Sequence, residues 1–114
     1  MTTTPLVLYS GGQVGNSNTT LVTGGNNVQA TIITTATFTN TDTVPHTLTV
    51  YLVRNSGSPS SSNKLISSLQ LIGGQSYVSS ELQGQILSTG DTIQAIADVA
   101  AKITCAGIPG YIVT

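Results

Sequence analysis

The 114-residue chain carries three basic and four acidic side chains, so charged residues make up 6% of the sequence and the formal net charge is −1. Soluble domains are ordinarily about 25% charged. Catalysis, metal binding and phosphate recognition all need ionic or titratable groups close together, and three basic residues could neutralise very few phosphates. The composition therefore argues against an enzyme, a metal or cofactor site and a nucleic-acid partner.

The length and the hydrophobic residues predict a single β-sandwich domain over residues 1–114. Its core would be aliphatic, since the chain has ten Ile, ten Leu and ten Val but one Phe and no Trp. The lone Cys105 excludes an intrachain disulfide. No apolar run is long enough to span a membrane, and the first residues lack the pattern of a secretory signal. We therefore expect assembly in a cytoplasm, without a membrane partner.

The first predicted element is a short strand over residues 5–9. Residues 1–8 admit two interpretations, because they can form an ordinary edge strand or an N-terminal arm that becomes ordered only on a partner. Unpaired strand edges can also pair with the edge of a neighbouring chain. The residues that we assign to partner contact are Thr3, Thr4, Pro5, Leu6, Val7 and Leu8.

Two longer runs with alternating side chains follow. Residues 28–38 alternate with period two, broken at positions 33–34, and residues 47–54 alternate in the same way, as half-buried strands do. The intervening segment, 40–46, has the Asn, Asp and Pro residues of a turn. We predict a hairpin centred near Thr43 that aligns the two apolar faces. It would pair Phe38 with Leu48 and Ala36 with Val50, and the predicted buried face of the first run comprises Val28, Ala30, Ile32, Ala36 and Phe38.

The rest of the chain carries weaker strand signals. The Ser-rich segment 55–63 is predicted to be an exposed loop, and Gly73-Gly74-Gln75 a tight hairpin between strands at 64–72 and 76–79. Residues 92–102 fit a strand–turn–strand better than the alternative, a short helix with Asp91 as its N-cap. Further strands are expected at 103–106 and 111–113. The fold prediction is an all-β, antiparallel β-sandwich or jelly-roll-like domain with seven to nine short strands.

His46 and the few carboxylates are the candidates for chemistry. A hydrolase would use His46 as a base oriented by Asp42, but the chain has no Gly-x-Ser-x-Gly elbow, and we expect a solvent-exposed histidine in a turn. Glu81 and Asp91 could act as a glycosidase pair, yet no Trp is present to hold a sugar, and turn or strand-end roles are favoured. We therefore predict no catalytic residues.

Few residues of the chain could bind a metal ion or act as a reactive thiol. Asn40, Asp42 and Thr43 could supply oxygen ligands for calcium, but a single carboxylate is weak support, and an Asx-type turn is the favoured interpretation. Cys105 alternates with Ile103, so it is expected to be a small buried hydrophobic residue rather than a reactive thiol. No metal or cofactor site is predicted.

The pattern of the later segments resembles that of small β-sandwich virion proteins of tailed bacteriophages, including capsid decoration or cement proteins. The resemblance extends over roughly residues 28–110. It is carried by Phe38-Thr-Asn-Thr-Asp42 leading into Thr47-Leu-Thr-Val-Tyr-Leu-Val53, by Gly74-Gln-Ser-Tyr77 and Glu81-Leu82, and by Gln85-Ile-Leu-Ser-Thr-Gly-Asp-Thr-Ile-Gln94-Ala95.

The resemblance implies a non-enzymatic β module located in the virion, which binds the major capsid protein or other virion proteins, with no active-site residues. It also implies a homo-dimer or homo-trimer. A tail, collar or fibre-attachment module is an alternative of the same class. A carbohydrate-binding sandwich is an alternative of another class, for which the available aromatic residues are Tyr9, Tyr51, Tyr77, Tyr111 and Phe38.

Overall fold

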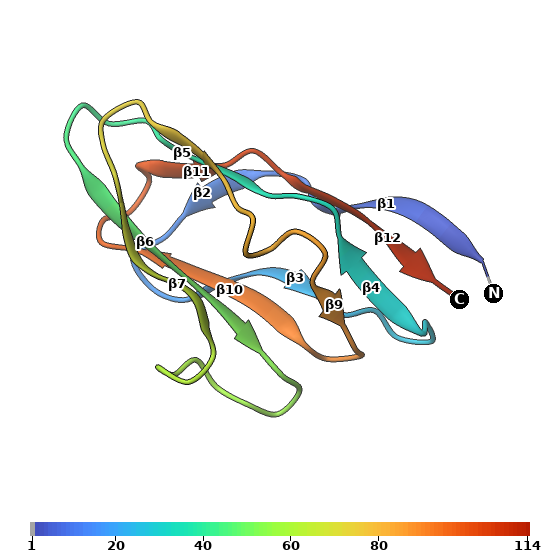
Figure 1. Cartoon of the computed structure of the whole chain (residues 1–114). Helices are drawn as coiled ribbons and strands as arrows, with labels where there is room; N and C mark the ends of the chain where they lie inside the picture. The colour runs from blue at the N-terminus through green and yellow to red at the C-terminus, as the bar shows by residue number, and fades with distance from the viewer. Residues whose placement is uncertain (1) are drawn as a thin grey trace.

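The computed structural model describes residues 2–114. Within these residues the chain folds into twelve β-strands and no helix, which confirms the all-β prediction (Figure 1). The strands are β1 (Thr3–Tyr9), β2 (Gly12–Val14), β3 (Thr19–Thr23), β4 (Ala30–Ile33), β5 (Thr37–Asn40), β6 (His46–Val53), β7 (Lys64–Leu71), β8 (Ser76–Val78), β9 (Ile86–Leu87), β10 (Thr92–Ala97), β11 (Ile103–Cys105) and β12 (Ile108–Val113).

The strands form two antiparallel layers. One layer joins two sheets end to end, β1-β12-β4-β9 and β2-β11-β5-β8. The chain passes from one of these sheets to the other between β1 and β2, β4 and β5, β8 and β9, and β11 and β12. The other layer is the sheet β3-β10-β6-β7. The twelve strands are therefore eight longer segments, four of them interrupted. Successive segments lie in opposite layers, except for β6 and β7, which pair within one layer, and this is the order of a jelly roll. This arrangement agrees with the predicted sandwich.

Four loops cross between the layers at one end of the sandwich, and we call them the crossover loops. They are residues 15–18, 41–45, 72–75 and 98–102. Backbone hydrogen bonds join neighbouring loops and strands here, including Thr41 N–H to Lys102 O at 2.8 Å and Ala97 N–H to Gly15 O at 2.9 Å. The end of the molecule that holds the crossover loops is thus tied together by bonds between distant parts of the sequence.

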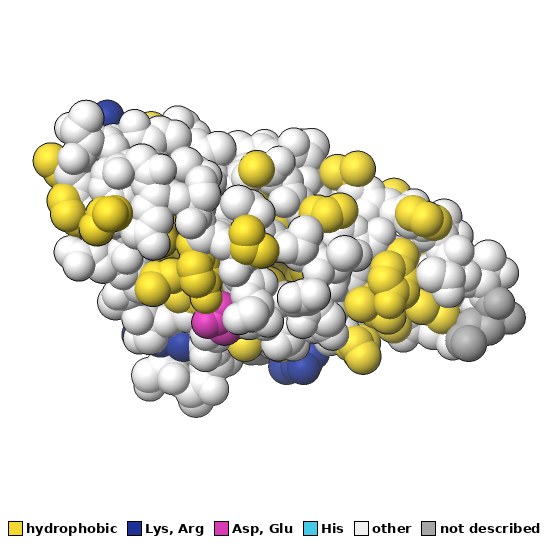
Figure 2. Space-filling model, turned by 45° about the horizontal axis from the view of Figure 1, so that its top comes forward, with side chains coloured by type: hydrophobic (Ala, Val, Ile, Leu, Met, Phe, Trp, Pro, Cys, Tyr) yellow, Lys and Arg dark blue, Asp and Glu magenta, His cyan; other side chains and the backbone are white. Residues whose placement is uncertain are grey.

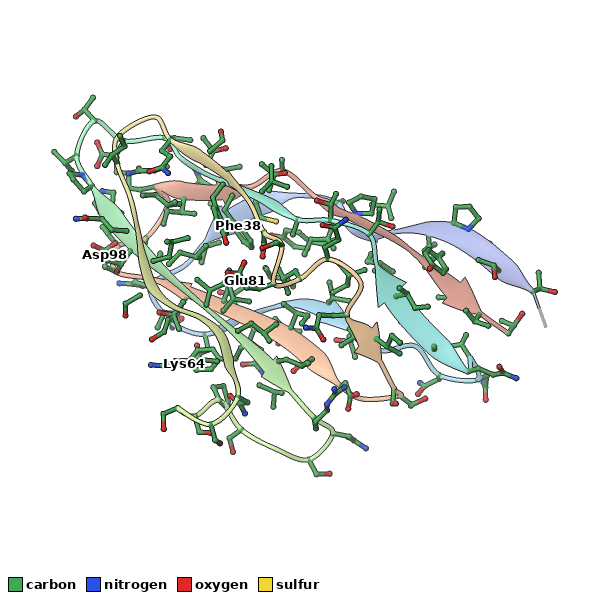
Figure 3. All side chains as sticks on the ribbon, viewed as in Figure 1. Phe38, Lys64, Glu81 and Asp98 are labelled. Carbon is green, nitrogen blue, oxygen red and sulfur yellow. The ribbon has the colours of Figure 1, made fainter. Side chains whose placement is uncertain are left out.

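The core lies between the layers and is aliphatic, as predicted. Phe38 is completely buried there (Figure 3). The thiol of Cys105 is buried as well, which confirms its interpretation as a small hydrophobic residue. Large side chains from both layers meet in this core, among them Val14, Ile33, Leu48, Leu71, Leu82, Leu87, Ile93, Ile103 and Ile108.

The predicted hairpin around Thr43 is wrong. Strand β5 pairs with β8 and β11, whereas β6 pairs with β7 and β10, so the two strands lie in different layers. The same correction applies to the predicted hairpin at residues 73–75, since β7 and β8 also lie in different layers. Alternation of apolar residues is the same whether two strands pair side by side or face each other across a core, and this explains both errors.

The run 28–38 is not one strand, because residues 34–36 interrupt it between β4 and β5. The buried face changes across the interruption: Thr31 and Ile33 are buried in β4, whereas Ala36 and Phe38 are buried after it. The predicted inward positions 30 and 32 are therefore wrong. Thr31 tolerates burial because its hydroxyl accepts a hydrogen bond from Gly25 N–H at 3.1 Å.

Two further predictions are confirmed. Residues 92–102 form strand β10 followed by a turn, with Ile93, Ala95 and Ala97 buried in alternation, so the helix alternative is not observed. The segment 55–63 is a loop in which most residues are exposed.

Candidate functional site

Strand β1 places the predicted contact residues at an edge of the first layer. It pairs with β12 in continuous register from Thr3 opposite Val113 to Val7 opposite Pro109. Leu6 is 48% exposed and Val7 67% exposed, so the strand presents large apolar side chains to solvent. Leu8 is half-buried and packs over Gly110, where a methyl group would collide with it and with the Ile32 carbonyl oxygen. Residues 3–9 thus form an edge strand that is held against the sandwich.

The free edge of β1 lacks a donor at its centre. Thr2 and Thr114 exchange two backbone hydrogen bonds, of 2.9 and 2.8 Å, so alternate residues from Thr2 onward face β12. Pro5 belongs to the other set, whose backbone groups face the free edge, and proline has no N–H. A proline at such a position discourages strand addition. What this edge presents to solvent is therefore the apolar side chains of Leu6 and Val7 rather than a complete row of backbone donors.

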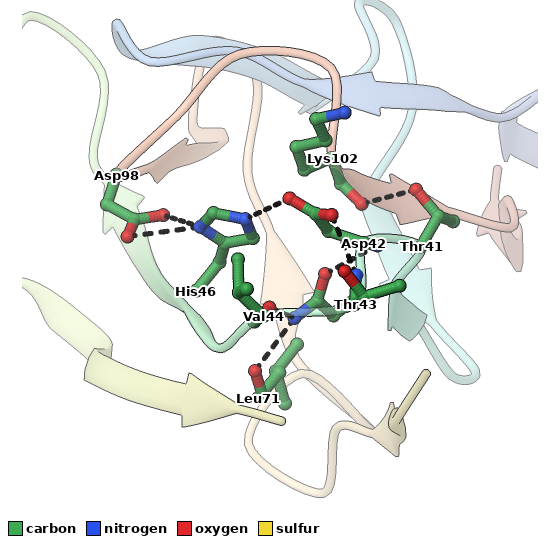
Figure 4. A network of polar contacts seen from close by, with 9 residues as sticks. Thr41, Asp42, Thr43, Val44, His46, Leu71, Asp98 and Lys102 are labelled. Atoms are coloured by element: carbon green, nitrogen blue, oxygen red, sulfur yellow. Dashed lines mark hydrogen bonds and ion pairs between the residues drawn. The ribbon is translucent and has the colours of Figure 1, made fainter. Parts of the chain in front are cut away.

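A histidine lies between two carboxylates at the crossover loops (Figure 4). His46 Nε2 is 2.8 Å from Asp42 Oδ2, and His46 Nδ1 is 3.2 Å from Asp98 Oδ1. The His46 side chain is 11% exposed, so the prediction of a solvent-exposed turn histidine is wrong. Its position at the start of β6 directs the ring toward the loop 98–102, which the sequence alone did not bring near it.

The two carboxylates determine what His46 can do. The hydrogen bond with Asp42 raises the pKa of His46, and partial burial opposes this only in part. The same bond lowers the pKa of Asp42, assisted by Thr43 N–H, which donates to the carboxylate at 2.7 Å. Since both ring nitrogens face carboxylates, neither is free to accept a proton from a serine. The arrangement therefore does not assemble the hydrolase triad that the sequence suggested.

The buried side chain of Asn40 bonds several backbone groups at the same end of the molecule. Its side chain is completely buried, and Nδ2 donates to the carbonyl oxygens of Val44 and Leu71, each at 2.9 Å. Its Oδ1 accepts from Asp42 N–H at 2.9 Å, which confirms the Asx-type turn. These bonds join the loop 41–45 to the end of β7, and they occupy the oxygen that a calcium ion would need. The turn is thus structural.

The other two carboxylates belong to separate clusters. Asp91, at the opposite end from the crossover loops, accepts a hydrogen bond from Arg54 Nη1 at 2.8 Å. Glu81 accepts from the Tyr77 hydroxyl at 2.5 Å and from the Ser79 hydroxyl at 3.2 Å. The bond from Tyr77 lowers the pKa of Glu81 and raises that of Tyr77. Glu81 and Asp91 share no hydrogen-bond partner, so the structure does not join them as the paired acids of a glycosidase.

The described residues form neither a pocket nor a metal-binding cluster. Residues 2–114 contain no pocket, and no group of three or more His, Cys, Asp or Glu side chains among them could hold a metal ion. No helix in this part of the chain is long and apolar enough to cross a membrane. The features that stand out are therefore an exposed strand edge and a hydrogen-bonded end, neither of which resembles a catalytic cleft.

Comparison with known proteins informs the fold. No protein-family model and no curated protein sequence matches the chain. A chain in the structure of infectious bursal disease virus, Gx strain, is similar with a TM-score of 0.56 and 13% sequence identity. The similarity covers 98% of this chain and 33% of that chain, so this chain spans about a third of the length of the chain that it matches. At this identity, the likeness shows the shared fold alone.

Proposed function

We propose that the chain is a non-enzymatic structural protein of a virion, and specifically a decoration or cement protein of a tailed bacteriophage. In this role it binds the major capsid protein and stabilises the shell. The observation that carries the proposal is the likeness of its fold, over 98% of its length, to a chain from the structure of a virus. The jelly-roll topology supports it, because this architecture recurs in viral capsid proteins.

The surface chemistry is consistent with fixed protein neighbours. Figure 2 shows a face that is mostly polar and uncharged, with scattered hydrophobic groups and few ionic ones. Contacts made through hydroxyl, amide and apolar groups depend less on salt than networks of exposed ion pairs do. We assign the contact with the capsid to the β1 edge, and chiefly to Leu6 and Val7. The chain would bind the capsid as a homo-dimer or a homo-trimer.

Binding to shells tests the proposal. We expect the purified chain to co-sediment with phage shells assembled without it, and a Leu6→Thr/Val7→Thr variant to bind at least about tenfold more weakly. The reason is that burial of an apolar side chain contributes about 1 kcal/mol or more, and 1.4 kcal/mol is a tenfold change. Analytical ultracentrifugation of the free chain should show a dimer or a trimer.

A matched control variant tests whether the β1 edge, rather than any exposed apolar side chain, makes the contact. Val78→Thr changes a side chain that is 63% exposed on β8, at the opposite edge of the same layer, and should leave binding unchanged. Equal losses in both variants would refute the assignment of contact to β1. A wild-type chain that stays in the supernatant would refute the decoration role, whereas a labelled chain found only at the tail by electron microscopy would identify a tail or collar module.

A further inference from the structure

His46 joins two crossover loops through opposite sides of its ring. Nε2 contacts Asp42 of the loop 41–45, and Nδ1 contacts both Oδ1 and Oδ2 of Asp98, at 3.2 and 3.3 Å, in the loop 98–102 (Figure 4). We propose that His46 is a proton-controlled latch: the imidazolium ties the two loops together, and loss of its proton releases one of the two ties.

The chemistry of the ring requires a proton for both contacts. An ionised carboxylate can only accept hydrogen bonds, so each ring nitrogen must donate. A neutral imidazole has a single N–H and can donate to Asp42 or to Asp98, but not to both. The remaining nitrogen would then place its lone pair against a carboxylate oxygen. The arrangement of the three side chains is therefore that of the charged form.

The latch lies where the two layers are joined. The loop 41–45 carries the chain from β5 in the first layer to β6 in the second, and the loop 98–102 carries it back from β10 to β11. Without the latch the two loops still share the bonds from Thr41 N–H and Thr41 Oγ1 to Lys102 O, at 2.8 and 2.7 Å. Asp98 N–H still donates to Thr47 O in β6 at 3.2 Å, and the Asn40 side chain still bonds Val44 and Asp42. Loss of the contact between His46 and one carboxylate would thus loosen the loop 41–45, in which Val44 is exposed, while the core stays closed.

The charged groups around His46 are few. Asp42, Asp98 and Lys102 lie on the two latched loops, and the ammonium of Lys102 assists in lowering the pKa of Asp42. The other crossover loops, 15–18 and 72–75, contain no charged residue. Two carboxylates thus face His46 directly, and the cation acts chiefly on Asp42. The surroundings favour the protonated ring.

The sign of the pH dependence follows from these shifts. Because the pKa of His46 is raised in the folded chain, the latch contributes its full stability below about pH 6.5 and loses it as the pH rises through the folded value. The pKa of Asp42 is lowered, so its contribution is present above about pH 3.9 and is lost as the pH falls through the folded value. The latch should hold between these limits.

NMR of the untagged protein tests the latch directly, because His46 is the sole histidine and its ring C–H signals need no assignment by mutation. We expect a titration midpoint above about 6.5, and each pH unit above this value is a tenfold stronger preference of the proton for the folded site. Asp98→Asn should lower the midpoint, since it removes one negative charge. A wild-type midpoint at or below 6.5 would overturn the proposal.

Amide hydrogen exchange reports on the loops themselves. After correction for intrinsic exchange rates, protection of the Thr41 and Asp98 amides should fall as His46 loses its proton. The amides of Asn55 and Ser88, which bond Asp91 at the other end of the molecule, serve as an internal control and should not change. Constant protection at Thr41 and Asp98 across the titration would show that the ring does not control the loops.

Discussion

Replacing Asp91 with Asn is expected to lower the free energy of unfolding by about 3 kcal/mol, because one buried carboxylate satisfies donors from two loops, 54–63 and 88–91. Oδ2 accepts from Arg54 Nη1 at 2.8 Å and from Ser88 N–H at 2.9 Å, and Oδ1 accepts from Asn55 N–H at 2.9 Å. An amide in its place would turn an NH2 group toward one of these donors. Denaturation by urea at neutral pH, followed by circular dichroism, measures the loss.

A second variant identifies which bonds matter at Asp91. The Arg54 side chain is 61% exposed, so Arg54→Met should cost less than about 1 kcal/mol, as exposed ion pairs usually do. If Arg54→Met costs as much as Asp91→Asn, the ion pair and not the backbone donors stabilises this end of the sandwich.

The contribution of Asp91 should also depend on pH. Burial by itself would raise the pKa of Asp91, but the hydrogen bonds from Arg54, Ser88 and Asn55 outweigh it and lower the pKa. The stability is therefore present above about pH 3.9 and is lost as the pH falls through the folded value. The difference between the wild type and Asp91→Asn should shrink in that acidic range, and an undiminished difference there would contradict a role for the charge.

Asn40→Leu is expected to destabilise the chain by about 3 kcal/mol, although the two side chains have similar volumes, because buried groups are left without partners. The carbonyl oxygens of Val44 and Leu71 each lose a donor, and Asp42 N–H loses its acceptor. The loop 41–45 would no longer be joined from inside to the end of β7. The same urea denaturation measures the effect.

The neighbouring residue on β5 provides the control for Asn40. Thr39 exchanges a hydrogen bond of 2.8 Å with the Ser76 hydroxyl on the outer face of the sheet. Thr39→Val should change stability by no more than about 0.5 kcal/mol, since the bond is exposed to water. If Asn40→Leu changes the stability as little as Thr39→Val does, the loop 41–45 is held by its backbone bonds alone.

The residues of the candidate site could be predicted from the sequence only in part. The local pair Asp42 and His46 could be recognised from its spacing, as could the Asx-type turn that begins at Asn40. Asp98 was missed as a partner of His46, because 52 residues separate them and no local pattern connects them. The edge position of β1 was one of two alternatives, and its missing central donor became visible only once the pairing with β12 placed Pro5.

A β-protein with an aliphatic core and a surface poor in charge could be predicted from the residues alone, because strand alternation, turn residues and composition are local properties. The same local patterns indicated the strand–turn–strand at 92–102 and the burial of Cys105 and Phe38. Which strands pair became known only from the folded chain, in which β5 and β6 lie in opposite layers. Pairing depends on contacts between distant residues, such as Thr41 with Lys102, which are 61 positions apart. The alternation of apolar residues along a strand carries no information on such contacts.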